Sequence, residues 1–152
     1  MKLIILGLLL GVFALVFGMS ANFTTFGNLK FFLDGASFAV VCILTVGTLL
    51  IVCRGSFISS VTSTWKRDID DQTLDRSIQF WKAAKRYAIA YGFIGTVMGM
   101  VLILQVFGGD PGGQFIPLSI AILAVYYGLI LGYLVFDPIA CLLEARKGVA
   151  EP

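Results

Sequence analysis

Four long apolar runs, separated by shorter polar segments, dominate the hydrophobic pattern of the chain. They cover residues 3–19, 35–53, 87–107 and 115–136, and none of them contains Asp, Glu, Lys, Arg or His. Each run has close to the ~20 residues that an α-helix needs to cross the hydrocarbon core of a bilayer. Because unpaired backbone amides are costly in lipid and the alternation of a barrel strand is absent, we expect four transmembrane helices.

The first run has a competing interpretation as a secretory signal peptide. Lys2 precedes it, and Met19-Ser20-Ala21 at its end offers a small-residue cleavage site. The run is long for the apolar core of such a peptide, and this cleavage site is poor. We therefore expect residues 3–19 to be retained as the first span.

The positions of the cations predict how the helices are oriented. Residues 54–86 carry seven Lys and Arg residues and residues 137–152 carry two, whereas residues 20–33 and 108–114 hold only Lys30. Cytoplasmic loops of membrane proteins are enriched in such cations, so both termini and the 54–86 loop are expected inside the cell. The predicted fold is a single all-α integral membrane domain, 1–152, with a short helical cytoplasmic loop at 54–86 and a cytoplasmic tail at 137–152.

Composition agrees with this fold and excludes several functions. Of the 152 residues, 59% are hydrophobic and 13% are charged, which is too apolar for a water-soluble domain. The net charge of +2 accompanies no basic stripe with interleaved aromatics, so nucleic-acid binding is not expected. The chain has no His, its three Cys residues lack disulfide or metal spacing, and it has no nucleophile with an adjacent base. We expect neither an enzyme nor a metal or cofactor site.

The 54–86 loop is predicted to contain a helix that leads directly into the third span. Leu74, Ile78, Trp81 and Ala84 recur at helical spacing, and the acidic pair before them suits a helix N-terminus. Lys82, Lys85 and Arg86 would then lie at the lipid headgroups. Other charged residues of the loop are candidates for contact with a cytoplasmic effector, with simple solvation as the alternative. These candidates are Lys66, Arg67, Asp70, Asp71, Asp75 and Arg76.

Small residues recur every three or four positions in the third and fourth runs, a pattern that lets helix backbones approach closely in a membrane. The candidates for packing against a partner helix are Gly92, Gly95, Gly99, Ala124, Gly128 and Gly132. The alternative is that they only hold the chain's own helices together. Thr96 lies beside this face and is the candidate for lining an ion pathway, or for bonding back to the Gly92 carbonyl.

A carboxylate is missing from all four runs, although proteins that move protons usually keep one in the membrane at considerable cost. Asp34 and Asp137 stand only at the ends of runs. If ions cross here, the titrating group must come from another polypeptide.

Residues 88–100, AIAYGFIGTVMGM, resemble the third-helix signature of MotA, an aromatic-glycine pair followed by IGTVMG. Asp110-Pro111 is similar to that family's outer turn, 119–128 to its fourth helix and 134–140 to its exit from the membrane. The chain therefore resembles the MotA/TolQ/ExbB proton channel superfamily over about residues 86–146, and within it the four-span MotA-type stator subunits.

This resemblance implies an ion-channel subunit of a stator-like motor complex, which converts ion-motive force into mechanical work in a bacterial inner membrane. A pentamer of this chain would surround a dimer of a single-span partner of the MotB or ExbD kind, whose intramembrane aspartate binds the ion. Thr96 would line the ion path, the third and fourth helices would face the partner, and Pro138 would take part in conformational coupling.

The chain departs from MotA in three respects. Its cytoplasmic region is much shorter and lacks the segment that contacts a flagellar rotor, and Ile89 stands where the family has a proline. Val125 replaces a threonine associated with sodium binding, so H⁺ is expected rather than Na⁺. Two alternatives stay open: an energy transducer to the outer membrane of the ExbB or TolQ type, and a membrane scaffold without transduction.

Overall fold

The computed structural model describes residues 33–55, 57–64, 66, 69–107 and 115–150, together with seven positions between Gly7 and Phe17. Every regular element among these residues is a helix. The elements are α2 (Gly35–Val52), α3 (Phe57–Ser63), α4 (Asp71–Phe107), α5 (Phe115–Leu129), the π-helical segment η2 (Ile130–Phe136) and α6 (Asp137–Ala150).

Three stretches of the described residues are long and apolar enough to cross a membrane. They are Gly35–Val52, Asp71–Val106 and Pro117–Lys147, and they contain the second, third and fourth expected spans. The expected first span, 3–19, and the two expected outer segments lie largely outside the described residues. The chain is thus a multi-pass membrane protein, and its described part is all-helical with three candidate spans.

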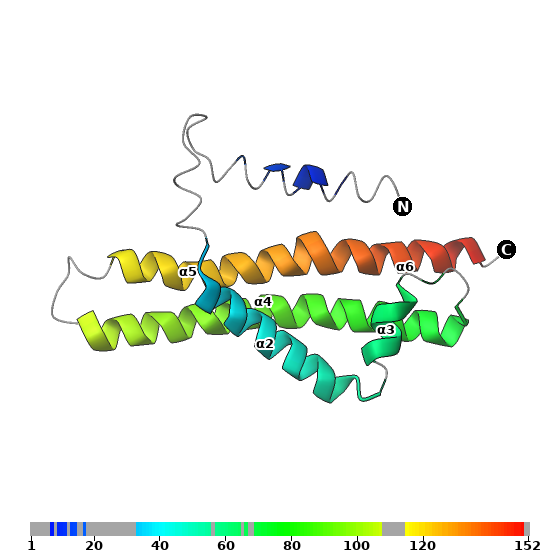
Figure 1. The fold of residues 1–152 in the computed structure, drawn as a ribbon, viewed down its shortest axis with the longest axis horizontal. Coiled ribbons are helices and arrows are strands. Elements are labelled where there is room, and N and C mark those ends of the chain that lie inside the picture. The colour runs from blue at the N-terminus through cyan, green and yellow to red at the C-terminus, as the bar shows by residue number, and fades with distance from the viewer. Residues whose placement is uncertain are drawn as a thin grey trace.

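Two long antiparallel helices form the body of the molecule (Figure 1). One is α4, and the other is the continuous rod formed by α5, η2 and α6, while α2 crosses both obliquely. The short helix α3 lies beside the N-terminal part of α4. The third and fourth expected spans therefore pack against each other as antiparallel neighbours.

Asp34 and Gly55 explain where α2 begins and ends. Asp34 has an extended backbone, and its Oδ2 accepts a hydrogen bond of 2.9 Å from the Ser37 N–H, which satisfies one of the free amides of the first turn. After Cys53 the chain turns at Gly55, whose φ of 75° is readily adopted only by a residue without a side chain.

The Asp34 cap predicts a pH dependence of stability. Hydrogen bonds from the Ser37 side chain and backbone hold the pKa of the Asp34 carboxyl below its ordinary value of 3.8. A carboxyl with a lowered pKa stabilises the fold above its ordinary pKa, and that contribution is lost as the pH falls through the folded-state pKa. The cap is therefore expected to contribute about 1 kcal/mol at neutral pH and progressively less in acid.

Thermal unfolding of the wild type and of Asp34→Asn in detergent measures this dependence. Asn keeps an acceptor oxygen but does not titrate, so the two proteins should be about equally stable at neutral pH. At about pH 3 the Asn variant should be the more stable. An equal loss of stability in both proteins on acidification would contradict the assignment.

The N-terminal part of α4 and helix α6 continue to pack against each other beyond the apolar spans. Leu74 and Ile78 of α4 pack against Leu143 of α6, which is only 1% exposed, and Ala84 packs with Leu49 and Phe80. Trp81 contacts both clusters. The helical spacing noted at Leu74, Ile78, Trp81 and Ala84 is thus the buried face of a continuous helix, as predicted.

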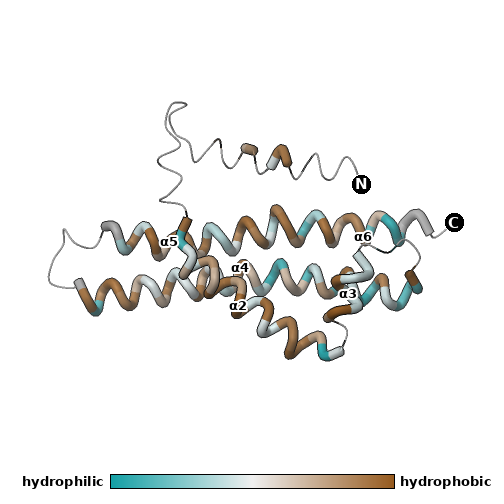
Figure 2. Tube along the Cα trace, in the orientation of Figure 1, coloured by the Kyte–Doolittle hydropathy of each residue, from teal (hydrophilic) through white to brown (hydrophobic). Residues whose placement is uncertain are grey.

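The fourth helix does not end where its apolar run ends at residue 136. It continues to Ala150, because the apolar face of α6 is covered by α4. Figure 2 shows the change along both long helices, from hydrophobic residues in the spans to hydrophilic residues near α3 and α6. Many apolar side chains of the spans are exposed, for example Ile43 at 69% and Val97 at 59%, as suits helices that contact acyl chains.

Candidate functional site

The backbones of α4 and α5 are in direct contact at two glycines. A Cβ added to Gly92 would lie 2.9 Å from the carbonyl oxygen of Ala124, and one added to Gly128 would lie 2.6 Å from that of Ala88. Real Cβ atoms essentially never come closer than 3.0 Å to such atoms. A residue with a side chain at either position would therefore force the two helices apart.

The other small residues extend this contact in both directions. Added Cβ atoms would lie 3.0 Å from the Ala124 side chain at Gly95 and 2.7 Å from the Ala121 side chain at Gly99. At Gly132, in η2, the nearest atom would be a side-chain carbon of Ile89 at 2.9 Å. All six candidate packing residues thus serve contact within the chain. Contact of the same residues with a partner helix stays a prediction.

Thr96 lies inside this interface and is 8% exposed. Its Oγ1 is 3.1 Å from the Gly92 carbonyl oxygen and donates to the Ala121 carbonyl oxygen at 2.9 Å, and it accepts from the Val125 N–H at 3.2 Å. Ala121 and Val125 are the two residues that an ordinary helical hydrogen bond of α5 would join. The hydroxyl therefore links α4 to the backbone of α5, besides the expected bond to Gly92.

Two tyrosine hydroxyls connect α2 to the same pair of helices. Tyr91 of α4 shares a hydrogen bond with Thr48, and Tyr127 of α5 accepts one of 2.8 Å from the Asp34 N–H. Sequence reasoning did not select these residues as functional. Each of these tyrosines stands within an apolar run of the sequence. A buried tyrosine hydroxyl usually has a hydrogen-bond partner, so such a position could have indicated a contact with another helix.

Three ion pairs join the N-terminal part of α4 to α6. They are Lys85–Asp137 at 2.9 Å, Lys147–Asp75 at 2.8 Å and Lys82–Glu144 at 2.5 Å. The Lys85 ammonium also lies 4.3 Å from the centre of the Tyr133 ring. Lys85 and Asp137 have the least exposed side chains of these pairs, so their link across the edge of the spans is the least screened by solvent.

The charged residues proposed for effector contact have different surroundings. Asp75 is paired with Lys147, Asp71 lies in the first turn of α4, and the Asp70 carbonyl accepts from the Leu74 N–H. The Lys66 carbonyl accepts a hydrogen bond from Arg146. Arg76 lines a pocket beside α2. Arg67 lies outside the described residues. Lys66 and Asp70 line one small pocket between α3 and the start of α4. Contact of these residues with an effector stays a prediction.

Pro138 stands directly after the π-helical turn of η2. The Asp137 N–H donates a hydrogen bond to the Gly132 carbonyl, five residues earlier. Pro138 has no N–H and so cannot donate the next hydrogen bond of a regular α-helix. Wider turns of this kind are rare inside helices and are often found at functional sites. The widened turn is packed against α4 through Gly132 and Ile89. Pro138 was selected through the family resemblance, because the apolar run itself ends at residue 136.

The model of the MotA/TolQ/ExbB proton channel family matches residues 54–150. The chain belongs to this family. Members of the MotA/TolQ/ExbB family are channels and transducers rather than enzymes, and they work together with partner membrane proteins. The match runs from the end of α2 through α6, so the α4–α5 interface, η2 and the ion pairs all lie in the part that defines the family.

A curated protein that the chain resembles is "Uncharacterized protein YtxD" from Bacillus subtilis (strain 168), which is 39% identical over 66 residues. The aligned part covers 43% of this chain and 24% of the relative, so the chain spans about a quarter of that protein's length. Among the described residues, His, Cys, Asp and Glu side chains form no group of three that would hold a metal ion.

Proposed function

We propose that the chain is the ion-channel subunit of a MotA-like stator complex that converts ion-motive force into mechanical work. In this complex a pentamer of the chain surrounds a dimer of a single-span partner, and the partner's intramembrane aspartate binds the ion. Pro138 and η2 then transmit the movement of the spans to the cytoplasmic end of α4 and to α6.

The observation that carries this proposal is the combination of a channel-family match with spans that hold no acid. No Asp or Glu occurs within residues 87–107 or 115–136, which both lie in the matched region. A proton moving through a bilayer needs a titratable group, because an uncompensated charge in hydrocarbon is very costly. In a proton channel built from such helices, the acid has to be supplied by another chain.

The proposal includes four spans with both termini in the cytoplasm of a bacterial cell. Supporting this orientation, the cations of residues 54–86 and 137–152 lie at one end of the long helices. The third and fourth spans face the partner, and exposed apolar side chains of α4 and α5, such as Val97 and Ile122, supply surface for this packing.

Native purification from a mild detergent tests the proposed composition. We expect several copies of the chain to elute with fewer copies of a protein that has one transmembrane helix and one intramembrane aspartate. Substituting that aspartate by Asn should abolish ion flux in vesicles while the complex stays assembled. A chain that conducts ions as a monomer without an acidic companion would overturn the proposal.

We propose H⁺ as the ion because the oxygen ligands for a dehydrated Na⁺ are few. The Val125 side chain has no oxygen to offer, and its backbone N–H donates to Thr96. A sodium site wants several oxygen ligands. Ion flux should therefore persist when external Na⁺ is replaced by K⁺ at constant proton-motive force. A flux that requires external Na⁺ would show that the proposal of H⁺ as the transported ion is wrong.

A second candidate is an energy transducer to the outer membrane of the ExbB or TolQ type. It is favoured by the short cytoplasmic connection between α2 and the third span, which consists of α3 and the first turns of α4. The co-purified partner separates the two candidates. A partner whose periplasmic part contacts the outer membrane favours transduction, and a partner domain that anchors to the cell wall favours a stator.

A further inference from the structure

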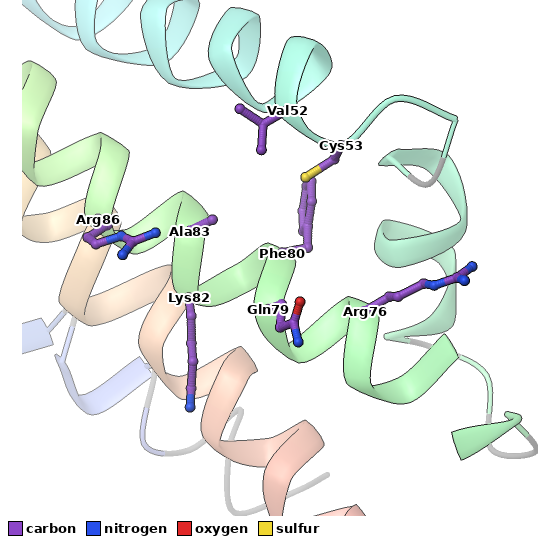
Figure 3. A pocket seen from close by; sticks show the side chains of 8 residues that line it. All are labelled: Val52, Cys53, Arg76, Gln79, Phe80, Lys82, Ala83 and Arg86. Atoms are coloured by element: carbon purple, nitrogen blue, oxygen red, sulfur yellow. The ribbon is translucent and has the colours of Figure 1, made fainter. Parts of the chain in front are cut away.

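A basic pocket of about 740 Å³ lies between the C-terminal end of α2 and the N-terminal part of α4. Its lining consists of two residues from α2's end and six from α4. They are Val52, Cys53, Arg76, Gln79, Phe80, Lys82, Ala83 and Arg86. Figure 3 shows Val52 and Cys53 above Phe80 and Ala83, with Arg76 and Arg86 on opposite sides of them.

The charge of this lining is positive and only partly neutralised. Three lining residues are basic and none is acidic. Lys82 extends away toward α6, where it pairs with Glu144. Neither Arg76 nor Arg86 makes an ion pair with any residue that the structure describes. Two guanidinium groups are therefore available to a negatively charged ligand, and guanidinium groups bind phosphate oxygens especially well.

The sequence spacing aligns the lining along one face of α4. Arg76, Gln79, Ala83 and Arg86 follow one another at intervals of three, four and three residues, which places them on one stripe of a helix. At a rise of 1.5 Å per residue, the two arginines are about 15 Å apart along the axis, and apolar residues lie between them. The pocket thus places an arginine at the start of the apolar run beside apolar side chains of α2 and α4, which suits an amphipathic ligand.

The pocket lies where the chain passes from apolar to polar surroundings. Val52 and its neighbour Ile51 are 56% and 73% exposed at the end of an apolar span, and Arg54 follows directly. On α4, the apolar run begins immediately after Arg86. Side chains at such a boundary lie at the level of lipid headgroups, and basic pockets there recognise anionic lipids.

We propose that this pocket binds an anionic phospholipid of the cytoplasmic leaflet. Arg86, next to the apolar run, binds the phosphate, and Arg76, about 15 Å farther along α4, adds a longer-range attraction for the anionic headgroup. The acyl chains follow the exposed apolar side chains at the end of α2. The site does not depend on which ion the complex carries. A bound lipid would lie between α2 and α4.

Native mass spectrometry of the detergent-purified protein tests the site with dioleoyl phosphatidylglycerol and dioleoyl phosphatidylcholine as probes. The anionic lipid should be retained about tenfold more strongly. Arg86→Gln should reduce its retention about fivefold, and Arg76→Gln should have a smaller effect. Lys66→Gln is the matched control, because it removes one cation from the same polar region without touching the lining, and it should leave retention unchanged.

A second variant fills the pocket without removing a charge. Gln79 is exposed, so Gln79→Trp should keep the helical circular dichroism spectrum and elution volume of the wild type while displacing the lipid. The proposal is overturned if Lys66→Gln lowers retention as much as Arg86→Gln, if both lipids bind equally, or if Gln79→Trp binds like the wild type. Displacement by inorganic phosphate at concentrations equal to those of the lipid would also overturn it, since the site would then recognise free phosphate.

Discussion

Gly128→Ala is expected to be the most destabilising Gly→Ala substitution among the glycines that the structure describes. The new Cβ would lie 2.6 Å from the Ala88 carbonyl oxygen and 3.0 Å from the Gly92 Cα, which are both backbone atoms. A side chain could rotate away from such a clash, but backbone atoms move only if α4 and α5 separate. Overpacking of a tight interface costs about 1–3 kcal/mol, and a clash with backbone belongs at the upper end of this range.

Gly47→Ala in α2 is the matched control, because no atom lies within 4 Å of its added Cβ. Alanine favours a helix by up to about 1 kcal/mol over glycine, so this variant should be as stable as the wild type or more stable. Thermal unfolding followed by circular dichroism in the same detergent compares the two variants. Equal stability of Gly128→Ala and Gly47→Ala would mean that the two backbones are not in contact.

Thr96→Val is expected to stop ion flux while leaving the assembly intact. Valine has nearly the shape of threonine, and the Ala121 carbonyl and Val125 N–H that lose their partner can bond to each other along α5. Assembly should therefore be preserved. We propose that the hydroxyl lines the ion path, as the family resemblance implies. Flux should therefore fall by at least about tenfold, which corresponds to ~1.4 kcal/mol in the barrier.

Thr96→Ser keeps the hydroxyl and should restore flux, since it loses only a methyl group. Flux is measured with a pH-sensitive dye in vesicles that contain the complex, and assembly is measured by the elution volume. Unchanged flux in Thr96→Val with normal assembly would assign Thr96 a purely structural role. That outcome would favour the membrane scaffold, in which the small-residue faces serve only to assemble helices.

The six small residues show what helical spacing in the sequence can predict and what it cannot. Spacings of three and four residues correctly placed Gly92 and Gly99 on one face of α4, and Ala124 and Gly128 on one face of α5. Periodicity states which residues share a face, but not which element covers that face. The structure shows α4 and α5 covering each other, which was the alternative weighed against partner packing.

The hydrogen bonds of Thr96 likewise divide into one that the sequence could predict and two that it could not. Its bond to the Gly92 carbonyl, four residues earlier in the same helix, follows from local helix geometry and could be predicted from the sequence. Its bonds to Ala121 and Val125 join positions more than twenty residues distant in the chain and depend on the register of α4 against α5. No local pattern specifies that register. The link between Asp34 and Tyr127 escaped prediction for the same reason.

The amino-acid sequence alone determined that this protein is helical and lies in a membrane, and that its helices have small-residue faces but no acid of their own. These properties follow from side-chain transfer free energies and helical spacing, which are set residue by residue along the chain. Only the tertiary structure decided that the glycine faces meet each other, that Lys85 pairs with Asp137, and that two arginines remain beside a pocket at the end of α2. Those outcomes depend on which helices become neighbours and at what register, and that choice is made by packing of the whole chain at once.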